Sequence, residues 1–176
     1  MKKIFSLIAI VFLVSCSSTK KIPAVKNTKG DLVGHVTKES FKVEPYGSDW
    51  FNDFYEYYET DKEVINKLKP LLKDVKIKGF MGTWCGDSKR EIPNFYKLLD
   101  EAGFNSKNIE LIAVNRSKKA KDLEEGLNII RVPTFIFYKD GKEIGRFVEH
   151  AVDGSTIEKD FLKIVSGQDY KHPYQK

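Results

Sequence analysis

The stretch 109–114, Ile-Glu-Leu-Ile-Ala-Val, limits the possible folds more than any other part of the chain. It is nearly all apolar, which is typical of a strand that is buried on both faces of its sheet. A sheet of this kind needs a covering layer on each face. We therefore expect an α/β fold in which helices cover both faces of a central sheet.

The segments around this stretch carry the patterns of further strands and helices. We predict strands at 32–36, 75–81, 135–138 and 143–148. We predict helices at 88–102, at 117–127 and from Ser155 to a stop at Gly167. Asp140-Gly141 is a hairpin signal between the last two strands. This order implies a parallel crossover unit followed by an antiparallel hairpin, which makes a central mixed sheet flanked by helices.

Residues 32–74 are predicted to form an N-terminal, partly helical extension that packs on a core domain at 75–167. Five aromatic residues between Trp50 and Tyr58 fall at helical spacing, a pattern more often found in core packing than on a ligand surface. Thr60 and Glu63 form a capping-box pattern for the following helix. Pro70 should kink or end that helix.

The first residues of the chain have the pattern of an export signal. Lys2 and Lys3 precede an apolar run at 4–14 that is of signal-peptide length and short for a membrane span. The run ends in Leu-Val-Ser-Cys, which resembles the bacterial lipobox, and this resemblance implies a lipid on Cys16. We expect a signal peptide at 1–15, a polar tether at 16–31, and an exported lipoprotein anchored to a membrane of the bacterial cell envelope, on the periplasmic side.

The chain has two cysteines, Cys16 and Cys85. If lipid occupies the first, Cys85 is the one free thiol of the mature chain, and no intramolecular disulfide can form. The formal charge of +5 is modest and no dense Arg/Lys stripe is present, so we expect no nucleic-acid partner. His35, His150 and His172 are scattered without metal-ligand spacing, so we expect no metal and no cofactor.

Two separated motifs carry the expected chemistry. Trp84-Cys85-Gly86-Asp87-Ser88 lies where a predicted strand gives way to a helix, and Pro93 follows within that helix. Val132-Pro133-Thr134 directly precedes the hairpin. Together these motifs resemble the thioredoxin family, with Trp-Cys-X-X-Cys at a helix start and a cis-proline facing the cysteine. The resemblance covers residues 70–166 and implies a thioredoxin-like fold, with Cys85 as the nucleophile and a cis bond before Pro133.

Elementary physics supports a reactive thiol at this place. Unpaired backbone N–H groups and the positive end of a helix dipole stabilise a thiolate at position 85 relative to a thiol. Trp84 would flank the sulfur, Gly86 would permit a tight turn, and Ser88 would cap the helix or donate a hydrogen bond to the thiolate. Pro133 in cis would present backbone to an extended substrate peptide. The effect of the negative charge of Asp87 on the thiol cannot be given a sign from the sequence.

Two positions depart from the family pattern. Ser88 replaces the second cysteine, so an outside thiol must complete any reaction that Cys85 begins. Gly79 stands where many thioredoxins carry a buried acid. The sequence therefore predicts a monothiol thiol–disulfide exchange protein, with oxidoreductase- or isomerase-like activity toward protein thiols, disulfides or small thiols.

Two alternatives stay open at this point. A redox-inert module with the same fold would use Trp84, Pro133 and the aromatic helix to bind a peptide or protein. Cys85-Gly86-Asp87-Ser88 is also similar to the Cys-Gly-Phe-Ser run of monothiol glutaredoxins, which would imply glutathione or an iron–sulfur cluster. The tryptophan before the cysteine and the export signal argue against the glutaredoxin interpretation. Arg116 and Arg131 are expected on the nucleophile's side of the sheet, most simply as solvated charges.

Overall fold

The computed structural model describes residues 21–175, and the expected signal peptide and Cys16 lie outside them. Six strands form one sheet in the order β1-β2-β4-β3-β5-β6. The strands are β1 Val25–Lys26, β2 Leu32–Val36, β3 Val75–Met81, β4 Ile109–Ala113, β5 Thr134–Lys139 and β6 Lys142–Val148. The helices are α1 Asn52–Tyr57, α2 Lys62–Leu71, α3 Gly86–Glu101 and α4 Ile157–Val165. A π-helical turn, Gly47–Phe51, leads into α1, and short 3₁₀ turns lie at Lys38–Phe41 and Ser106–Asn108.

The sheet is mixed, as the sequence predicts. β3 and β4 pair in parallel, with Gly79 opposite Leu111. β5 lies antiparallel on the other side of β3, with Gly79 opposite Phe135, and β6 is its hairpin partner. The parallel pair needs a crossover connection, which α3 supplies. The central mixed sheet predicted from the element order is confirmed.

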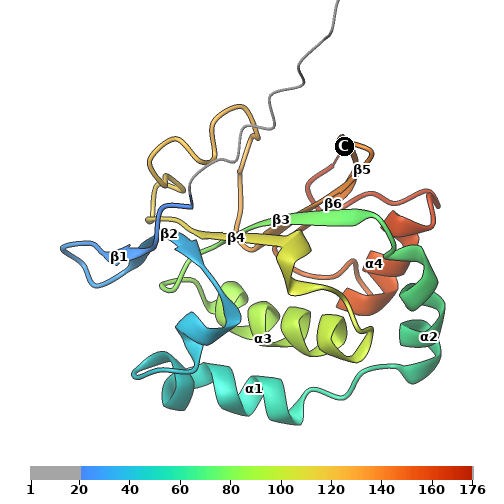
Figure 1. Ribbon diagram of the computed structural model, residues 1–176, viewed down its shortest axis with the longest axis horizontal. Helices are drawn as coiled ribbons and strands as arrows, with labels where there is room; N and C mark the ends of the chain where they lie inside the picture. The colour runs from blue at the N-terminus through green and yellow to red at the C-terminus, as the bar shows by residue number, and fades with distance from the viewer. Residues whose placement is uncertain (1–20, 176) are drawn as a thin grey trace, which may run out of the picture.

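The four α-helices all lie on one face of the sheet (Figure 1). The core on this face joins residues of all four helix regions to alternate residues of the strands, and it includes Phe95, Phe135 and Phe161. Phe95 stacks on Phe135 with ring centroids 4.2 Å apart, and Phe161 packs edge-on against both. This aromatic cluster fixes α3 and α4 against the strands that carry the candidate site.

The other face of the sheet carries a smaller core of Phe80, Ile112, Val114 and Ile136, which residues of the segment 115–132 cover. The prediction of a helix at 117–127 is wrong, because the structure has successive turns there. Lys118, Lys121 and Asp122 adopt left-handed backbone conformations, which interrupt any right-handed helix. In the described part of the chain this face is therefore covered by a loop and by no helix.

The N-terminal extension packs along the edge of the sheet and beneath α3 (Figure 1). β2 pairs with β4, and Trp50 and Phe51 enter the main core, as their spacing predicts. The cap of α2 differs from the prediction. Asp61 accepts hydrogen bonds from the N–H groups of Glu63 and Val64, whereas the Thr60 hydroxyl bonds Glu101. A cap of this kind stabilises a helix by about 1 kcal/mol.

Pro70 lies inside the last turn of α2, which ends one residue later. Within residues 21–175, no helix has the length and apolar character needed to cross a membrane.

Candidate functional site

Cys85 lies at the junction of β3 and α3. It is the N-cap residue of α3, with extended backbone angles, and its own N–H donates to the carbonyl of Gly82. The side chain is half-buried and free. Its sulfur is therefore held at the amino end of a 16-residue helix, where unpaired N–H groups and the helix dipole favour negative charge.

The thiol faces the segment that precedes β5. Cys85 Sγ donates to the carbonyl oxygen of Val132 at 3.2 Å. The Val132–Pro133 peptide bond is cis, as predicted. Thr134 begins β5, and its hydroxyl donates to the carbonyl of Arg131 at 2.8 Å. The two sequence motifs, 47 residues apart between Cys85 and Val132, therefore meet at one end of the sheet.

Trp84 is anchored beside the thiol. Its Nε1 donates to the carbonyl oxygen of Val114 at 2.9 Å, just beyond the end of β4. The indole ring lies against Gly82, where a Cβ atom would come within 2.6 Å of the ring. Any side chain at residue 82 would therefore displace Trp84. The Arg116 guanidinium lies 5.6 Å from the ring centroid, a cation–π distance that the sequence could not reveal.

Ser88 is fully buried and does not cap α3, because Cys85 is the N-cap residue. The Ser88 hydroxyl oxygen accepts a hydrogen bond from the N–H of Gly82 at 3.1 Å. Ser88 thus ties the first turn of α3 to the loop that carries the cysteine. A Cβ atom at Gly86 would meet no other atom within 4 Å, and the backbone there is not left-handed. Neither the backbone angles nor the surrounding space therefore requires a glycine at residue 86.

The charges of the first turn of α3 are paired with one another. Arg90 donates to Asp87 and to Glu91, each at 2.8 Å. Glu91 is only 7% exposed. Burial raises the pKa of the Glu91 carboxyl, although Arg90 opposes that effect. The Asp87 carboxylate thus forms an ion pair with Arg90.

Gly79 leaves no room for the buried acid of the family. A Cβ atom at this position would lie 2.7 Å from Leu111 Cδ1 and 3.1 Å from Phe135 Cδ1. Both neighbours are buried in the main core. The close packing of Leu111 on β4 and Phe135 on β5 against β3 therefore accounts for the glycine at residue 79.

The N-terminal extension also contacts the cysteine loop, which the sequence does not predict. The N–H of Leu32 donates to the hydroxyl of Thr83 at 3.1 Å. Arg116 lies 3.8 Å from the carboxylate of Asp31. No local pattern signals these contacts, because they join residues about 50 and 85 positions apart in the chain.

The remaining sequence candidates lie around the site or away from it. Pro93 is buried within α3. Arg131 lies 3.8 Å from Glu149 and against the ring of Tyr174. His35, on β2, forms a hydrogen bond with Glu110 on β4, and His150 forms one with the backbone carbonyl of Ala151. Among residues 21–175, no three His, Cys, Asp or Glu side chains gather as metal ligands would.

A half-exposed cysteine at a helix start, facing a cis-proline segment and flanked by tryptophan, defines a thioredoxin-type site. Residues 59–163 match the family model of thioredoxin, so the chain belongs to the thioredoxin family. The thioredoxin domain is that of thiol–disulfide oxidoreductases, which act on thiols and disulfides of proteins.

Sequence relatives agree with this assignment, and a solved structure shares the fold. A thioredoxin-like protein of Acanthamoeba polyphaga mimivirus is 31% identical over 52% of this chain and 63% of its own length. The chloroplastic thioredoxin Y2 of Arabidopsis thaliana is 33% identical over 55% of this chain and 49% of its own length. The chain thus spans less than two thirds of these relatives. A protein of unknown function from Pseudomonas aeruginosa shares the fold, with a TM-score of 0.58, 17% identity, and coverage of 76% of this chain and 93% of that one.

Proposed function

We propose that this protein is a monothiol thiol–disulfide exchange protein of the bacterial cell envelope, tethered by lipid on Cys16, with Cys85 as its nucleophile. The observation that carries the proposal is the placement of the Cys85 sulfur. It lies at the amino end of α3 and 3.2 Å from the carbonyl oxygen of Val132, beside the cis-proline.

The proposed reaction replaces one disulfide bond by another. The Cys85 thiolate attacks one sulfur of a partner disulfide, so that a mixed disulfide forms and the other partner sulfur leaves as a thiolate. The number of disulfide bonds is unchanged in this step. Proton transfer to the leaving thiolate comes from solvent, since Gly79 supplies no buried acid.

The mixed disulfide must be resolved from outside the domain. Ser88 holds the place of the second thiol, and a hydroxyl cannot attack the disulfide in its stead. We infer that a thiolate from another molecule attacks the partner's sulfur in the mixed disulfide. Cys85 then leaves as a thiolate, and the partner's sulfur forms a disulfide with the attacking thiol. The protein is thus suited to carry or exchange a thiol adduct rather than to reduce a disulfide by itself.

The test measures the reaction of the full chain, purified in detergent, with glutathione disulfide. We expect one glutathionyl adduct on Cys85, formed about tenfold or more faster in the folded chain than in the same chain unfolded in urea. Mass spectrometry of the peptide that contains Cys85 gives both rates. The adduct should persist until an external thiol is added.

Two variants complete this experiment. Cys85→Ser should form no adduct, and Cys16→Ser should react as the native sequence does. Equal or slower reaction of the folded chain would show that the fold does not activate Cys85. In that case the domain would be a redox-inert binding module.

A further inference from the structure

A groove of about 470 Å³ lies between the α1 region and the first half of α3. The residues that matter to its chemistry are Asp49, Asp53, Phe54, Tyr57, Arg90 and Asn94. The first four come from the N-terminal extension, and the last two come from α3, the helix that begins at the nucleophile. Residues 21–58 lie outside the segment that matches the thioredoxin family, so most of this groove is contributed by the extension.

Two aromatic side chains of the groove are open to solvent. Phe54 is 43% exposed, and Tyr57 is 76% exposed. They stand three residues apart on α1 and therefore share one side of the helix. Asn94, in the wall of the groove, is only 8% exposed, and its Oδ1 has no hydrogen-bond partner among the described residues. The groove thus exposes apolar surface to solvent.

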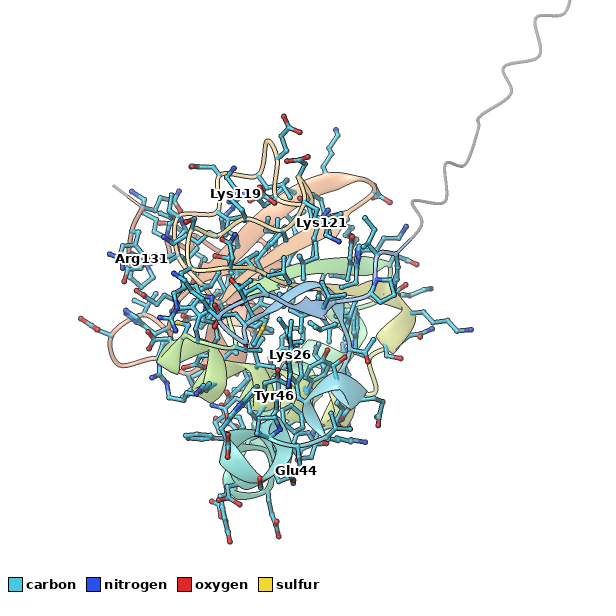
Figure 2. The ribbon with its side chains drawn as sticks, turned by 90° about the vertical axis from the view of Figure 1, so that its left-hand side faces the viewer. Lys26, Glu44, Tyr46, Lys119, Lys121 and Arg131 are labelled. Atoms are coloured by element: carbon cyan, nitrogen blue, oxygen red, sulfur yellow. The ribbon has the colours of Figure 1, made fainter. Side chains whose placement is uncertain are left out.

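The charge of the extension is negative, although the whole chain carries +5. Residues 43–61 contain six acidic residues and no lysine or arginine. Figure 2 shows Glu44 at this end of the molecule, whereas Lys119, Lys121 and Arg131 lie toward the opposite end.

The acids that line the groove are not neutralised within it. No ion pair in the described part of the chain reaches Asp49 or Asp53. Arg90, the one cation among the described residues that line the groove, is already held by Asp87 and Glu91. The groove therefore presents apolar surface beside unpaired negative charge, which complements a segment that joins a large apolar side chain to a cation.

The groove and the thiol site share helix α3. Arg90 lines the groove and bonds Asp87, which lies two residues after Cys85. The helical rise places Arg90 and Asn94 about 8 and 14 Å along the axis from Cys85. An extended peptide covers that span with about two to four residues.

We propose that this groove docks a basic-apolar segment of the partner protein whose sulfur exchanges with Cys85. The segment pairs Lys or Arg with a large apolar side chain, about four residues from the partner's reactive cysteine. The apolar side chain packs between Phe54 and Tyr57, and its cationic neighbour faces Asp49 and Asp53. This inference rests on the proposed thiol exchange for the partner's identity, while binding in the groove requires no chemistry.

The first measurement is non-covalent binding. A fluorescein-labelled peptide carries Leu-Arg four residues from a serine that replaces the reactive cysteine, and fluorescence anisotropy gives its affinity for the full chain in detergent. A matched peptide has Glu in place of Arg. We expect the Arg peptide to bind more tightly, and Asp49→Asn with Asp53→Asn to weaken it about fivefold, as two exposed ion pairs would.

The control variant is Asp74→Asn with Asp140→Asn. Both residues are exposed acids at the end of the sheet opposite Cys85, and asparagine tolerates their left-handed backbone. This variant should bind the Arg peptide as the native chain does. Equal affinity for the Arg and Glu peptides, or no effect of the Asp49 and Asp53 changes, would overturn the proposal.

The second measurement separates the groove from the chemistry. The same Arg peptide, now carrying its cysteine as a disulfide with glutathione, should exchange with Cys85 several-fold more slowly in the Asp49→Asn, Asp53→Asn variant. The reaction with glutathione disulfide alone should be unchanged. If the native chain reacts with neither the peptide–glutathione disulfide nor glutathione disulfide, the thiol exchange is refuted, and the binding result is unaffected.

Sedimentation of the native chain measures self-association and so tests whether a second copy of the chain occupies the groove. Self-association that Asp49→Asn with Asp53→Asn abolishes would show that a second copy, with its basic end, fills the groove. That result would overturn the proposed partner.

Discussion

Ser88 shows how one residue changes what the site can do without changing its form. In the dithiol members of the family the equivalent position carries the resolving cysteine. Here the Ser88 hydroxyl accepts the N–H of Gly82 and keeps the loop against the first turn of α3. The serine therefore preserves the geometry of the loop while it removes the second half of the redox reaction.

Replacement of Ser88 by cysteine should restore that second half. A thiol at residue 88 attacks the mixed disulfide on Cys85 intramolecularly, at an effective concentration in the millimolar range or above. With no external thiol present, we expect the Ser88→Cys variant to lose a pre-formed glutathionyl adduct within minutes, whereas the native adduct persists for hours. Mass spectrometry after removal of free glutathione follows the decay.

Ser88→Ala is the matched control for this experiment. It also removes the hydroxyl that binds Gly82, but it supplies no thiol. An adduct that decays equally fast in the alanine variant would show that loosening of the loop, rather than a resolving thiol, releases glutathione.

The elements differ in how far the sequence predicts them. The strands at the centre of the sheet and α3 follow from local apolar patterns, and these patterns place the Cys85 motif at a junction of strand and helix. The helix predicted at 117–127 is absent because a weak amphipathic pattern of side chains does not determine the backbone angles. Lys118, Lys121 and Asp122 are left-handed, and turns rather than a helix carry Ala120 onto the sheet.

The site was predictable only in its local part. The helix start follows from a local pattern. The cis bond at Val132–Pro133 follows from the resemblance of two short motifs to the thioredoxin family. The contacts of Arg116 with Trp84 and of Leu32 with Thr83 depend on tertiary packing of distant segments, which one sequence does not encode in any local pattern.

The covering segment 115–132 should respond to acid through Glu124. Its buried carboxylate accepts the N–H of Ala120 at 2.9 Å and the ammonium of Lys119 at 3.2 Å. Burial alone would raise the pKa of Glu124, but these bonds hold that pKa below its ordinary value. A lowered folded-state pKa contributes stability above the unfolded value of about 4.3, and that stability is lost as the pH falls through the folded pKa.

Hydrogen exchange reports this effect locally. A global unfolding curve would also contain the contribution of Glu91, whose pKa is raised and whose pH dependence therefore has the opposite sign. At pH 7, the backbone amides of the segment 115–132 should exchange several-fold faster in Glu124→Gln than in the native chain. The exchange rates of the β3 amides should be unchanged. The difference should vanish below the folded pKa of Glu124. Glu125→Gln, at the exposed neighbouring position, is the control, and an effect of equal size there would contradict the assignment to Glu124.

At the scale of the whole molecule, the thioredoxin domain occupies residues 59–163, and the chain adds an extension on its N-terminal side. β1, β2 and α1 of that extension lie against the edge of the sheet and beneath α3 (Figure 1). Through Leu32 and Asp31 it also contacts the cysteine loop and Arg116. The N-terminal segment thus contacts the loop that carries the thiol.

The proposed tether can be tested by changing one atom of the chain. Burial of acyl chains contributes about 0.8 kcal/mol per CH₂, so two or three chains on Cys16 hold a protein on a membrane when salt screens its charges. The native chain should stay in the membrane fraction after a high-salt wash, and Cys16→Ser should move to the soluble fraction. Cys85→Ser should stay bound. Release of the native chain by salt would instead assign its attachment to the +5 charge, and the lipid tether would be refuted.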